Sequence, residues 1–499
     1  MTLSPASIRS RAWLLAAVAA LSSPALAQQF VGNWEDPGGA GTPTVEFFVS
    51  PAGSDITGTG TNANPWRTVS FAVASAAPFI GTSATPAPTP APVSINVEPG
   101  TYDTAAGEMF PISVPAFGVT IETWRPTATG NPAPFDRPSL VGTGFAPNRP
   151  LINVDFIGTP GLPPSTIQTL EFSNSREGLR LEPGVLGVPI DIPIGVEVRQ
   201  NYFHDCFAIA LRIDTAADLT ARHIVEDNDF GDLVEDLNAI FGWAVREASS
   251  GTSSTLYRSN RIQNYEEGIQ VLAVNKGIAA PRIFSNFIQL AERSVTLDDC
   301  DSLVINNTIA FATDYTGAPA LEGLTINGGT FVVSNNILWC PIDPGSPGTP
   351  AVDLTINGAV GTLVTNTNED IPADPAPQFV GGDAHPNAIP TFPVDLHLTS
   401  TSPNIAAGTN AEALDPINTV RSVVVGGTIA RTDISVDIDL GGRIHRSGLA
   451  VEAGAVPLVE IGADEVEFTG ADVVFEFGSR IDFPVTATQD RFGHVLGQV

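Results

Sequence analysis

Lysine is nearly absent from this chain of 499 residues, in which Lys276 is the only example. Lysine and arginine together number 23 against 54 aspartates and glutamates, which gives a formal net charge of −31 at pH 7. A surface with this charge repels phosphate groups, so nucleic acids and anionic lipids are not expected partners. It also disfavours a polyanionic polysaccharide unless divalent cations bridge the two. The same acidity is equally typical of a protein that stays soluble in a salty or acidic habitat.

Cysteine is scarce as well, and familiar catalytic motifs are missing. The three cysteines, Cys206, Cys300 and Cys340, are an odd number, and we expect them to be small buried hydrophobes. Cys300 with Cys340 is the one disulfide pairing that we keep open. The sequence has no G-x-S-x-G segment, phosphate-binding loop or Cys/His metal set, and its histidines show no metal-ligand spacing.

The first residues have the pattern of a secretory signal peptide. Arg9 and Arg11 precede an apolar run over 12–21, and Ala25 and Ala27 are small residues just before position 28. We therefore predict that residues 1–27 are a signal peptide. No later apolar run is long enough to span a bilayer. The mature protein is expected to be secreted, periplasmic or attached to the cell surface.

The middle of the chain repeats one short phrase: an asparagine, any residue, and then a large apolar residue. Successive asparagines of this phrase are 27, 32, 26, 21 and 29 residues apart. A loose period of this size is typical of a solenoid, in which each unit covers the open end of its neighbour. The six phrases begin at Asn201, Asn228, Asn260, Asn286, Asn307 and Asn336.

The repeated unit has the pattern of strands. Short β-branched or apolar segments, such as 196–198, 269–271, 303–305 and 331–333, end at turn residues before any helical stripe could form. In stacked parallel coils the asparagine amides can form a ladder, each donating to one coil and accepting from the other. The alternative is that they are ordinary turn residues in left-handed backbone. Six in register favour the ladder, and the sequence predicts an all-β fold, a right-handed parallel β-helix.

A different pattern precedes the repeat, over residues 45–102. A glycine-rich stretch around Asp55 indicates a tight polar loop. Thr68 is the expected cap of a short helix over 69–76, and alternating residues over 93–97 predict a first strand. The helix would plug the end of the solenoid, whose first coil otherwise exposes its core and its unpaired edge.

Several residues of this segment match the pattern of a known family: Val49, Ser50, Gly53, Asp55, Gly58, Thr59, Pro65, Thr68 and the run Pro99-Gly100-Thr101-Tyr102. On these residues the segment resembles the family DUF1565, which is found at the N-terminus of bacterial parallel β-helix proteins. A Pro-rich insertion over 85–92 departs from the compact spacing of that family. The resemblance implies a β-helix fold and an extracellular location, and no particular reaction. The coils that follow are similar to the generic repeat of pectate-lyase-like proteins.

The C-terminal part contains an ordered series of motif residues: Phe379, Val380, the run Asp395-Leu396-His397-Leu398, Ser402, Pro403, Gly408, Asp439, Gly442, Arg443 and the run Ile461-Gly462-Ala463-Asp464-Glu465. On these residues it resembles the choice-of-anchor Q region of bacterial β-helix proteins. Where that family usually has Ala-Ile-Asp after Ser-Pro, this chain has Asn404-Ile405-Ala406. The expected parts of the mature chain are therefore a DUF1565-like cap with the first coils (28–135), β-helix repeats (136–385), a choice-of-anchor Q-like region (386–465) and a tail of unknown role (466–499).

Aligning the coils on their asparagines brings acidic residues to one edge of the expected solenoid. Asp205, Asp232 and Asn264 fall at one level, with His204 beside them. Carboxylates stacked one or two coils apart are roughly 5 to 10 Å apart. That range includes the separations in glycosidases, and it also lets carboxylates share a Ca²⁺ ion. The alternative is a solvated acidic face. The candidate acid/base or cation-binding residues are Asp232, Glu235, Asp236, Glu266 and Glu267.

A second acidic cluster consists of Asp298, Asp299 and Asp301, which we take as candidate Ca²⁺ ligands. It resembles the paired aspartates of polygalacturonase-type hydrolases, but the Gly-His-Gly and Arg-Ile-Lys elements of those enzymes do not occur here. The alternative is an ordinary Asp-rich turn. Lyases of this fold use a Lys or Arg base, for which Lys276 and Arg293 are candidates. An ion pair of Arg293 with Glu266 or Glu267 is the alternative role for that residue.

The expected function is that of an exported β-helix protein that binds or processes polysaccharide, as a lyase or glycoside hydrolase with Ca²⁺ as the candidate cofactor. The resemblance supplies most of this expectation, since fold alone does not fix function. The alternative is a non-catalytic cell-surface or adhesion protein with the solenoid as a rigid spacer. The low counts of Tyr (5) and Trp (6) favour the spacer, because sugars often stack on aromatic rings. An acid-lined groove of at least roughly 300 Å³ across three coils would favour the enzyme.

Overall fold

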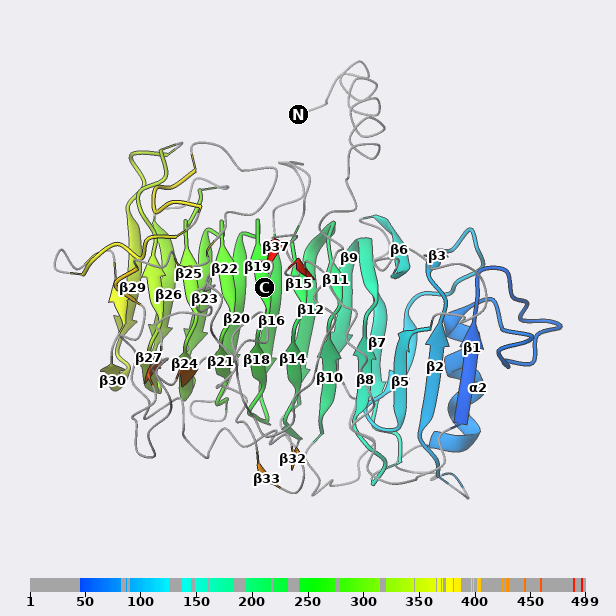
Figure 1. The fold of residues 1–499 in the computed structure, drawn as a ribbon. Helices are drawn as coiled ribbons and strands as arrows, with labels where there is room; N and C mark the ends of the chain where they lie inside the picture. The colour runs from blue at the N-terminus through cyan, green and yellow to red at the C-terminus, as the bar shows by residue number, and fades with distance from the viewer. Residues whose placement is uncertain are drawn as a thin grey trace, which may run out of the picture. The chain divides into compact units, whose positions relative to one another are not determined.

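The computed structural model describes residues 45–81, 87, 90–124, 137–144, 149–159, 161–182, 194–216, 219–231, 242–273, 279–314, 320–344, 346–364, 366–368, 370, 374–379, 381–386, 396, 398 and 402–404, and six short strands beyond residue 420. Residues 39–126 and 137–467 form one compact unit. Within it, the chain winds through parallel strands that are stacked coil on coil (Figure 1). The predicted all-β parallel solenoid is confirmed.

One face of the solenoid is a sheet of eleven parallel strands, here called sheet A. The sheet contains the predicted segments 196–198, 303–305 and 331–333. Its first strand, however, is β1 and not the segment over 93–97, which pairs with β1 in parallel. In their hydrogen-bonded order the strands are β1 (Val45–Val49), β2 (Val93–Val97), β5 (Val119–Thr123), β8 (Ser165–Gln168), β10 (Val196–Arg199), β14 (Ile224–Glu226), β18 (Leu256–Arg258), β21 (Arg282–Phe284), β24 (Ser302–Ile305), β27 (Thr330–Ser334) and β30 (Val360–Val364).

Two further faces complete each coil, one of short strands and one of long strands. The chain passes from sheet A through a short strand and a long strand back to sheet A. The short strands are β11 (Tyr202–Phe203), β15 (Asp229–Phe230), β19 (Arg261–Gln263), β22 (Phe287–Gln289), β25 (Thr308–Ala310), β28 (Ile337–Trp339) and β31 (Thr367–Asn368). The long strands are β12 (Cys206–Thr215), β16 (Trp243–Ser249), β20 (Glu267–Ala273), β23 (Arg293–Asp298), β26 (Leu321–Asn327) and β29 (Ala351–Asn357).

At the N-terminal end the short and long faces are continuous, because β9 (Glu171–Leu181) pairs with both β11 and β12. The strands before it on these faces are β3 (Gly100–Tyr102), β4 (Ile112–Pro115), β6 (Pro138–Gly144) and β7 (Pro150–Phe156). Two short strands, β13 (Thr220–Ala221) and β17 (Thr252–Ser253), pair in the turns that lead back to sheet A.

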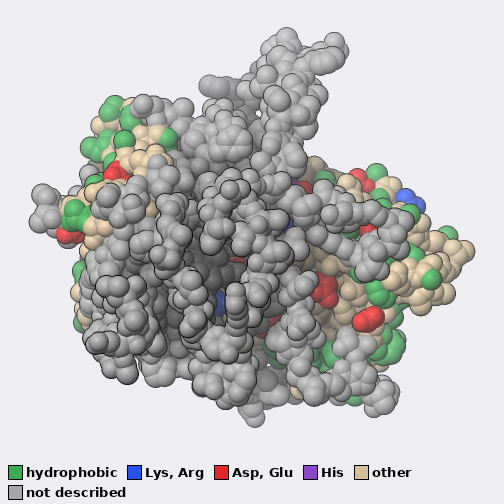
Figure 2. Space-filling model, in the orientation of Figure 1, with side chains coloured by type: hydrophobic (Ala, Val, Ile, Leu, Met, Phe, Trp, Pro, Cys, Tyr) green, Lys and Arg blue, Asp and Glu red, His purple; other side chains and the backbone are tan. Residues whose placement is uncertain are grey.

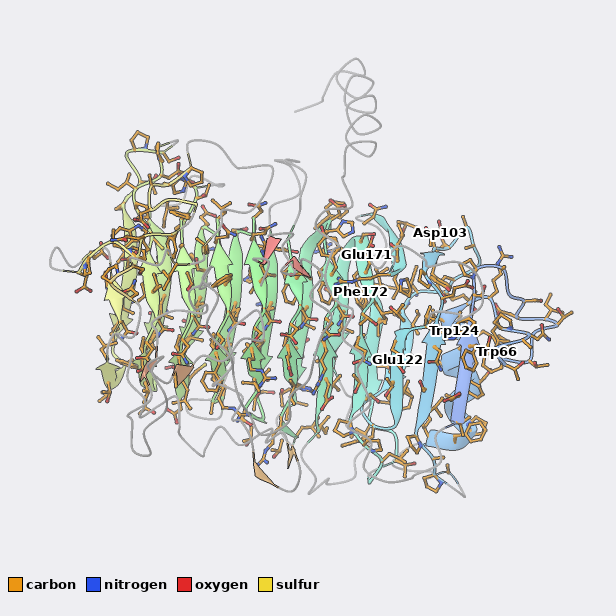
Figure 3. All side chains as sticks on the ribbon, in the orientation of Figure 1. Trp66, Asp103, Glu122, Trp124, Glu171 and Phe172 are labelled. Carbon is orange, nitrogen blue, oxygen red and sulfur yellow. The ribbon has the colours of Figure 1, made fainter. Side chains whose placement is uncertain are left out.

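The core consists of rows of inward-facing side chains at the same level of successive coils. Val198 and Val225, for example, pair in register and are completely buried. The rings of Phe172, Phe203 and Phe230 form a stack, with centroids 4.7 and 4.8 Å apart and interplanar angles of 9° and 6°. Each such ring contributes about 1.5–3 kcal/mol by burial. Figure 3 labels Phe172 at the start of this stack.

The repeated asparagines form the predicted ladder at the turn from sheet A to the short strands. Each side-chain Nδ2 donates to the Oδ1 of the asparagine one coil further on, over distances of 2.9–3.1 Å. Each amide also donates to a backbone carbonyl of the preceding coil, as Asn260 does to Val225 at 2.9 Å. Asn366 is a seventh member, which the repeated phrase missed because Asn368 stands where a large apolar residue was expected.

Left-handed backbone does occur at this turn, but one residue earlier than the alternative supposed. The residues that precede the ladder asparagines have positive φ, for example Gln200 (55°) and Ser259 (51°), whereas the asparagines themselves do not. The left-handed residue turns the chain, and the side-chain amide that follows it satisfies buried backbone groups of the preceding coil, as Asn260 does for Val225 O and Asn228 N. The asparagine is therefore selected for hydrogen bonding and not for its backbone conformation.

The N-terminal end is closed by the predicted helix, α2 (Val69–Ile80), which extends beyond the expected residue 76. The Thr68 side chain accepts from the backbone N of Phe71, as expected of an N-cap. The buried face of α2 packs against the first strands of the solenoid; it consists of Val69, Ala72, Val73, Ala76 and Ile80. The core of the first coils is thereby covered.

Two carboxylates fix the start of α2. Asp55 accepts from the backbone N of Arg67 (2.8 Å) and from the backbone N and hydroxyl of Thr68 (3.1 and 2.8 Å). Glu108, which is buried, accepts from Val69 N and Ser70 N at 2.7 and 2.9 Å, where a helix has unpaired N–H groups. Burial raises the pKa of the Glu108 carboxyl, and these hydrogen bonds oppose the rise.

The glycines of the DUF1565-like segment are required by close backbone packing. A Cβ atom on Gly53 would lie 2.2 Å from the carbonyl oxygen of Trp66, which no real side chain tolerates. Gly60 has a φ of +71° and lies against the Trp66 ring. These motif residues therefore build the cap of the solenoid.

Several predictions fall on residues outside the described part. These include the signal peptide over 1–27, most of the choice-of-anchor Q-like region and the tail over 466–499. Within the described residues of the C-terminal region, Phe379 and Leu398 form a single antiparallel bridge. The six short strands form three antiparallel pairs: β32 (Val424–Val425) with β33 (Thr428–Ile429), β34 (Ile444–His445) with β35 (Leu458–Val459), and β36 (Thr488–Gln489) with β37 (Val495–Leu496).

All three cysteines are free and buried, as expected of small hydrophobes, and the Cys300–Cys340 disulfide is not formed. Burial raises the pKa of the Cys300 thiol to about 12, and the Glu247 carboxylate adds to the rise. Within the described ranges, no helix is both long enough and apolar enough to cross a membrane.

Candidate functional site: the arginine row and its carboxylates

Three arginines lie at the same level of successive long strands, and we call them the arginine row: Arg180, Arg212 and Arg246. In β9, β12 and β16 they pair directly, Arg180 with Arg212 and Arg212 with Arg246. They point away from the core, because the neighbouring Leu179 and Leu211 of the same strands face inward and are completely buried. One coil separates each pair, a spacing of roughly 4.8 Å.

Each arginine of the row is held by a different contact. The Arg180 Nε donates to Glu177 at 2.8 Å, and the Arg212 Nε donates to Asp214 at 2.6 Å. Burial alone would lower the pKa of Arg212, but the hydrogen bond and charge of Asp214 raise it. The guanidinium of Arg246 lies 4.9 Å from the ring centroid of Trp243, a cation–π contact.

Arg246, the third arginine of the row, has a hydrogen-bond donor that no described residue accepts. The Arg246 Nε is buried and has no hydrogen-bond partner among the described residues. A buried donor without a partner is costly unless a ligand or water satisfies it. Arg246 and Trp243 therefore present a cation and an aromatic face on the same strand.

The next coils carry two of the predicted acidic residues together with the predicted arginine. Arg293 donates from Nε to Glu267 at 2.9 Å and from a terminal nitrogen to Glu266 at 3.2 Å. The predicted ion pair of Arg293 is thus present with both glutamates. Glu267 pairs with Trp243 on one side and Arg293 on the other, which places this group beside the arginine row.

Burial raises the pKa of both glutamates. For Glu267, which is almost fully buried, the charge and hydrogen bond of Arg293 oppose the rise, and the charge of Glu266 adds to it. For Glu266 the charge of Arg293 likewise opposes the effect of burial, and Glu292 adds to it. Two neighbouring carboxyls with raised pKa values are suited to proton transfer.

His204 lies at the edge of the same region, between two carboxylates. Its Nε2 is 3.0 Å from Glu171 Oε1 and its Nδ1 is 3.0 Å from Asp205 Oδ2. Tyr202 stacks on the imidazole, with centroids 4.7 Å apart. Burial alone would lower the pKa of His204, but the hydrogen bonds to Asp205 and Glu171 raise it to about 9. The imidazole is therefore charged at neutral pH. Ser139 also donates to Glu171, which Figure 3 labels on β9.

The alignment of the coils on their asparagines holds at the turn between short and long strands. Asp205 and Asn264, which the alignment put at one level, both have left-handed backbone there, with φ of 50° and 58°. Asp232, Glu235 and Asp236 lie outside the described residues, as does Lys276. Of the five candidate acidic residues, Glu266 and Glu267 are thus the two that the structure brings together.

The predicted Ca²⁺ ligands do not converge. Asp298 accepts from the Asn327 side chain at 2.7 Å, whereas Asp301 accepts from Thr330 N and its hydroxyl at 2.9 and 2.7 Å. Asp299, between them, has a φ of 55°. Across the described ranges no three His, Cys, Asp or Glu side chains are grouped so as to hold a metal ion. Asp298 and Asp301 each tie one coil to the next, and their role as Ca²⁺ ligands stays a prediction.

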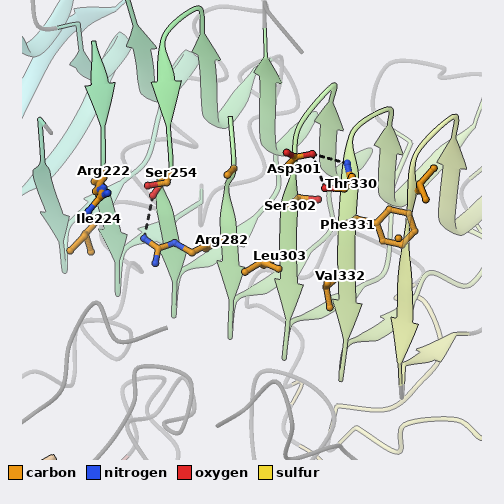
Figure 4. A pocket seen from close by; sticks show the side chains of 13 residues that line it. Arg222, Ile224, Ser254, Arg282, Asp301, Ser302, Leu303, Thr330, Phe331 and Val332 are labelled. Atoms are coloured by element: carbon orange, nitrogen blue, oxygen red, sulfur yellow. Dashed lines mark hydrogen bonds between the residues drawn. The ribbon is translucent and has the colours of Figure 1, made fainter. Parts of the chain in front are cut away.

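Two cavities of the described part lie elsewhere. A groove of about 850 Å³ crosses the outer side of sheet A, and its one acidic lining residue is Asp301 (Figure 4). A smaller hollow of about 340 Å³ lies beside α2 and is mainly apolar. Neither is the acid-lined groove expected of an enzyme of this fold. Figure 2 shows exposed acidic side chains over the end of the solenoid that carries β2 to β8.

Sequence reasoning missed the arginine row, although a signal is present. Each arginine follows an apolar residue that faces the core, in the triplets Leu179-Arg180-Leu181, Leu211-Arg212-Ile213 and Val245-Arg246-Glu247. A search for recurring apolar-Arg triplets would have found it.

Fold and site together define the class: this is an all-β parallel β-solenoid protein with a polar face on its long strands. Residues 51–279 match the family DUF1565, described as a protein of unknown function. A comparison with curated proteins gives no match.

Among solved structures, the fold is similar to that of pectate lyase Pel9A, with 14% identity and a TM-score of 0.36 over 86% of this chain and 98% of that one. The complex of XylC with xylose gives 12% identity and a TM-score of 0.28, over 64% and 86% of the two chains. The exopolygalacturonase from Thermotoga maritima gives 12% identity and a TM-score of 0.25, over 54% and 53%.

Proposed function

We propose that this protein binds polysaccharide along its long-strand face, with the arginine row as the contact surface. The observation that carries this proposal is the register of Arg180, Arg212 and Arg246, one coil apart on the outer side of the solenoid. A linear sugar polymer has a repeat that can follow such a row. Guanidinium groups form paired hydrogen bonds with carboxylates, so a polymer that contains acidic sugars fits best. Trp243 supplies an apolar ring against which a sugar can pack.

The arginine row provides local positive charge on a chain whose overall negative charge would repel an acidic polysaccharide. The net charge of −31 disfavours a polyanion in general. On the long strands, however, two carboxylates beside the row are paired with guanidinium groups, Glu177 with Arg180 and Asp214 with Arg212. These pairs reduce the negative charge next to the row. Ca²⁺ would add a further bridge, and it belongs to the proposal as a cofactor to be tested.

Processing of the bound polymer is the second part of the proposal, as a lyase or a glycoside hydrolase. Glu266 and Glu267 lie one coil beyond Trp243, and burial raises the pKa of both. A carboxyl with a raised pKa holds a proton closer to neutral pH and can serve as a general acid. Asp232, Glu235 and Asp236 remain candidates for the same chemistry.

One observation favours the alternative, a non-catalytic surface protein with the solenoid as a rigid spacer. The groove on sheet A and the hollow beside α2 are not lined by acids from several coils. Glycan binding on an open face needs no such groove, so both functions share the arginine row and differ only in chemistry.

The test is a panel of neutral and acidic polysaccharides, each with Ca²⁺ and with a chelator. Binding is measured by calorimetry, and cleavage by new reducing ends and by the absorbance of unsaturated uronate. Glu267→Gln is expected to keep binding and to lose any cleavage, and Asp155→Asn, at a half-buried strand position, is the matched control. Absence of binding to every glycan, with and without Ca²⁺, would contradict the proposal. Binding without cleavage would support the spacer.

We also propose that the protein is exported after removal of residues 1–27. The support is the sequence pattern of the first 27 residues. Mass spectrometry of the mature N-terminus is expected to find Gln28. A mature protein that retains Arg9 and Arg11 would contradict this.

A further inference from the structure

The C-terminal end of the solenoid is open, whereas α2 closes the N-terminal end. The last coil consists of β29, β30 and β31, and each of these strands pairs with a strand of the coil before it. Among the described strands, none pairs with their other side. Figure 1 shows β29 and β30 at the left end of the stack. The last coil therefore presents unpaired backbone N–H and C=O groups along its edge.

Core side chains come to the surface on this coil. Leu363 pairs with Val333 and Ile356 pairs with Ile326, and both residues of the preceding coil are completely buried. On the last coil, however, Leu363 is 49% exposed and Ile356 is 37% exposed. Val360, at the start of β30, is 73% exposed. Neighbouring exposed apolar side chains of this kind are typical of an interaction surface.

The described part of the chain after β31 lies over earlier coils and not over this end. Phe379 packs on Phe311, with ring centroids 6.0 Å apart, and the Trp339 Nε1 donates to the carbonyl of Asp383 at 2.9 Å. Phe311 follows β25 and Trp339 ends β28, so both belong to coils before the last one. These contacts direct the following segment away from the open end.

The last coil presents no charge, although the chain as a whole is strongly acidic. From Ala351 to Asn368 the one ionisable side chain is Asp353, which is completely buried and accepts from the backbone N of Cys340 at 2.7 Å. Two copies of a chain with a net charge of −31 repel each other over most of their surface. At this end they can meet without bringing like charges together. The three strands also lack the lysine and proline residues that usually protect an exposed edge.

We propose that this end binds the same end of a second copy of the chain, which gives a closed tail-to-tail dimer. A two-fold axis at the interface places the β30 strands of the two copies side by side and antiparallel, so that sheet A continues from one copy to the other. Leu363 and Ile356 of both copies are then covered. A fibre would need the N-terminal end as the second surface, and α2 closes that end. Because the end of one coil is small, the interface belongs to the weak and reversible class.

The experiment measures the mass of the mature chain by sedimentation, from roughly 1 to 200 µM, a range that covers weak interfaces. We expect monomer at the low end of the range and dimer at the high end. Hydrogen exchange locates the interface: the amides of β30 should exchange more slowly in the dimer, and those of β1 should not change. A monomer at every concentration, species larger than the dimer, or protection at β1 instead of β30 would overturn the proposal.

Variants of exposed residues test the surface itself. Val360→Glu adds a carboxylate to the edge of both copies and is expected to weaken the dimer about tenfold, because like charges then lie close across the axis. Ile56→Glu is the matched control, since Ile56 is 95% exposed in the cap loop at the N-terminal end; it should leave dimerisation unchanged.

A second edge variant guards against a change of fold. Thr362→Glu alters another exposed position of β30 and should weaken the dimer in the same way, while urea unfolding checks that each variant is folded. Dimerisation that is unaffected in both folded β30 variants would overturn the proposal, whatever the glycan result. Loss of the dimer in Ile56→Glu alone would place the interface at the opposite end and would also overturn it.

Discussion

The N-terminal cap and the arginine row lie on one solenoid and use their polar residues in opposite ways. In the cap, the carboxylate oxygens of Asp55 and Glu108 accept hydrogen bonds from backbone N–H groups around the start of α2. In the row, the arginines contact other side chains on the outer face, and Arg246 retains a donor. The recognisable motif therefore builds the scaffold, and the residues suited to a ligand have no motif.

This difference teaches where function should be sought in such chains. A residue that pairs with backbone is constrained by folding, and its conservation would say nothing of a ligand. A charged residue that lies outward at the same level of several coils has no role in the core. The comparison predicts large stability effects and no binding effects for scaffold residues, and the reverse for the row.

The largest effect is expected from the asparagine ladder, as part of the scaffold. Asn286→Ala removes donors to Asn307 Oδ1 and to the carbonyls of Tyr257 and Phe284, and it leaves Asn260 without its acceptor. Several buried groups lose partners, so the free energy of unfolding should fall by about 4 kcal/mol in urea titration. Asn327→Ala, on the outer face, is the control and should cost about 1 kcal/mol or less. Equal costs would show that the ladder adds nothing special.

The cap gives the next largest effect. Asp55→Ala removes three hydrogen bonds to the start of α2 and should lower the free energy of unfolding by about 3 kcal/mol. Polysaccharide affinity should stay within twofold of the original. Asp155→Ala, whose carboxylate contacts only Ser113 among described residues, serves as the control at under about 0.5 kcal/mol. A loss of glycan binding in the Asp55 variant would break the comparison.

His204 marks the boundary between the two kinds of region, because its charge supports the fold at the edge of the site. Its pKa of about 9 lies above the unfolded value of 6.5, so its stabilisation is complete below about pH 6.5 and disappears as the pH rises through about 9. Between these limits the wild-type free energy of unfolding should fall by about 2 kcal/mol more than that of His204→Gln.

The measurement is urea unfolding at several pH values. Glu171 has a lowered pKa, because the hydrogen bond and charge of His204 outweigh burial. Its contribution is therefore present above about pH 4.5 and is lost in acid. Parallel pH curves for wild type and His204→Gln would mean that the imidazole is not held in its charged form.

The smallest effect on stability, and the clearest on binding, is expected in the row. Arg212→Gln removes an outward cation that touches Asp214 and Glu177 near solvent, so stability should change by less than about 1 kcal/mol. Affinity for an acidic polysaccharide should fall about tenfold, which corresponds to about 1.4 kcal/mol. Calorimetry at two salt concentrations checks this, because an ionic contact weakens in salt. An unchanged affinity would remove the row from the proposed function.

The scaffold was predictable from the sequence because its chemistry is local and repeated. Thr68 caps a helix one residue later, and the ladder asparagines recur at every coil with an apolar residue two positions on. The strand β1 was missed because the cap loop and α2 separate it in sequence from its partner β2. Two parallel strands that are so far apart in the sequence do not follow the spacing of the repeat, so the repeat pattern does not reveal their pairing.

The positions of the arginine row could not be predicted by counting residues from the ladder asparagines, because the coils differ in length. Arg212 follows Asn201 by 212 − 201 = 11 residues, whereas Arg246 follows Asn228 by 246 − 228 = 18. An insertion after β15 shifts the count, although hydrogen bonding between long strands restores the register. Glu266 and Glu267 were predicted because few residues separate them from Asn260, so the number of residues from the ladder asparagine still gives their place in the coil. Asp298, Asp299 and Asp301 are close in sequence, but Asp298 contacts Asn327 and Asp301 contacts Thr330, so counting along the chain did not show where each carboxylate lies.

The hydrogen bonds between the ladder asparagines all run in one direction, because each Nδ2 donates to the Oδ1 of the coil that follows. Each coil therefore has a donor side and an acceptor side in the ladder. A duplicated coil that keeps its asparagine would continue the same hydrogen bonds on both sides. Added or removed coils would change the length of the long-strand face, while the cap formed by α2 at the N-terminal end would keep its contacts.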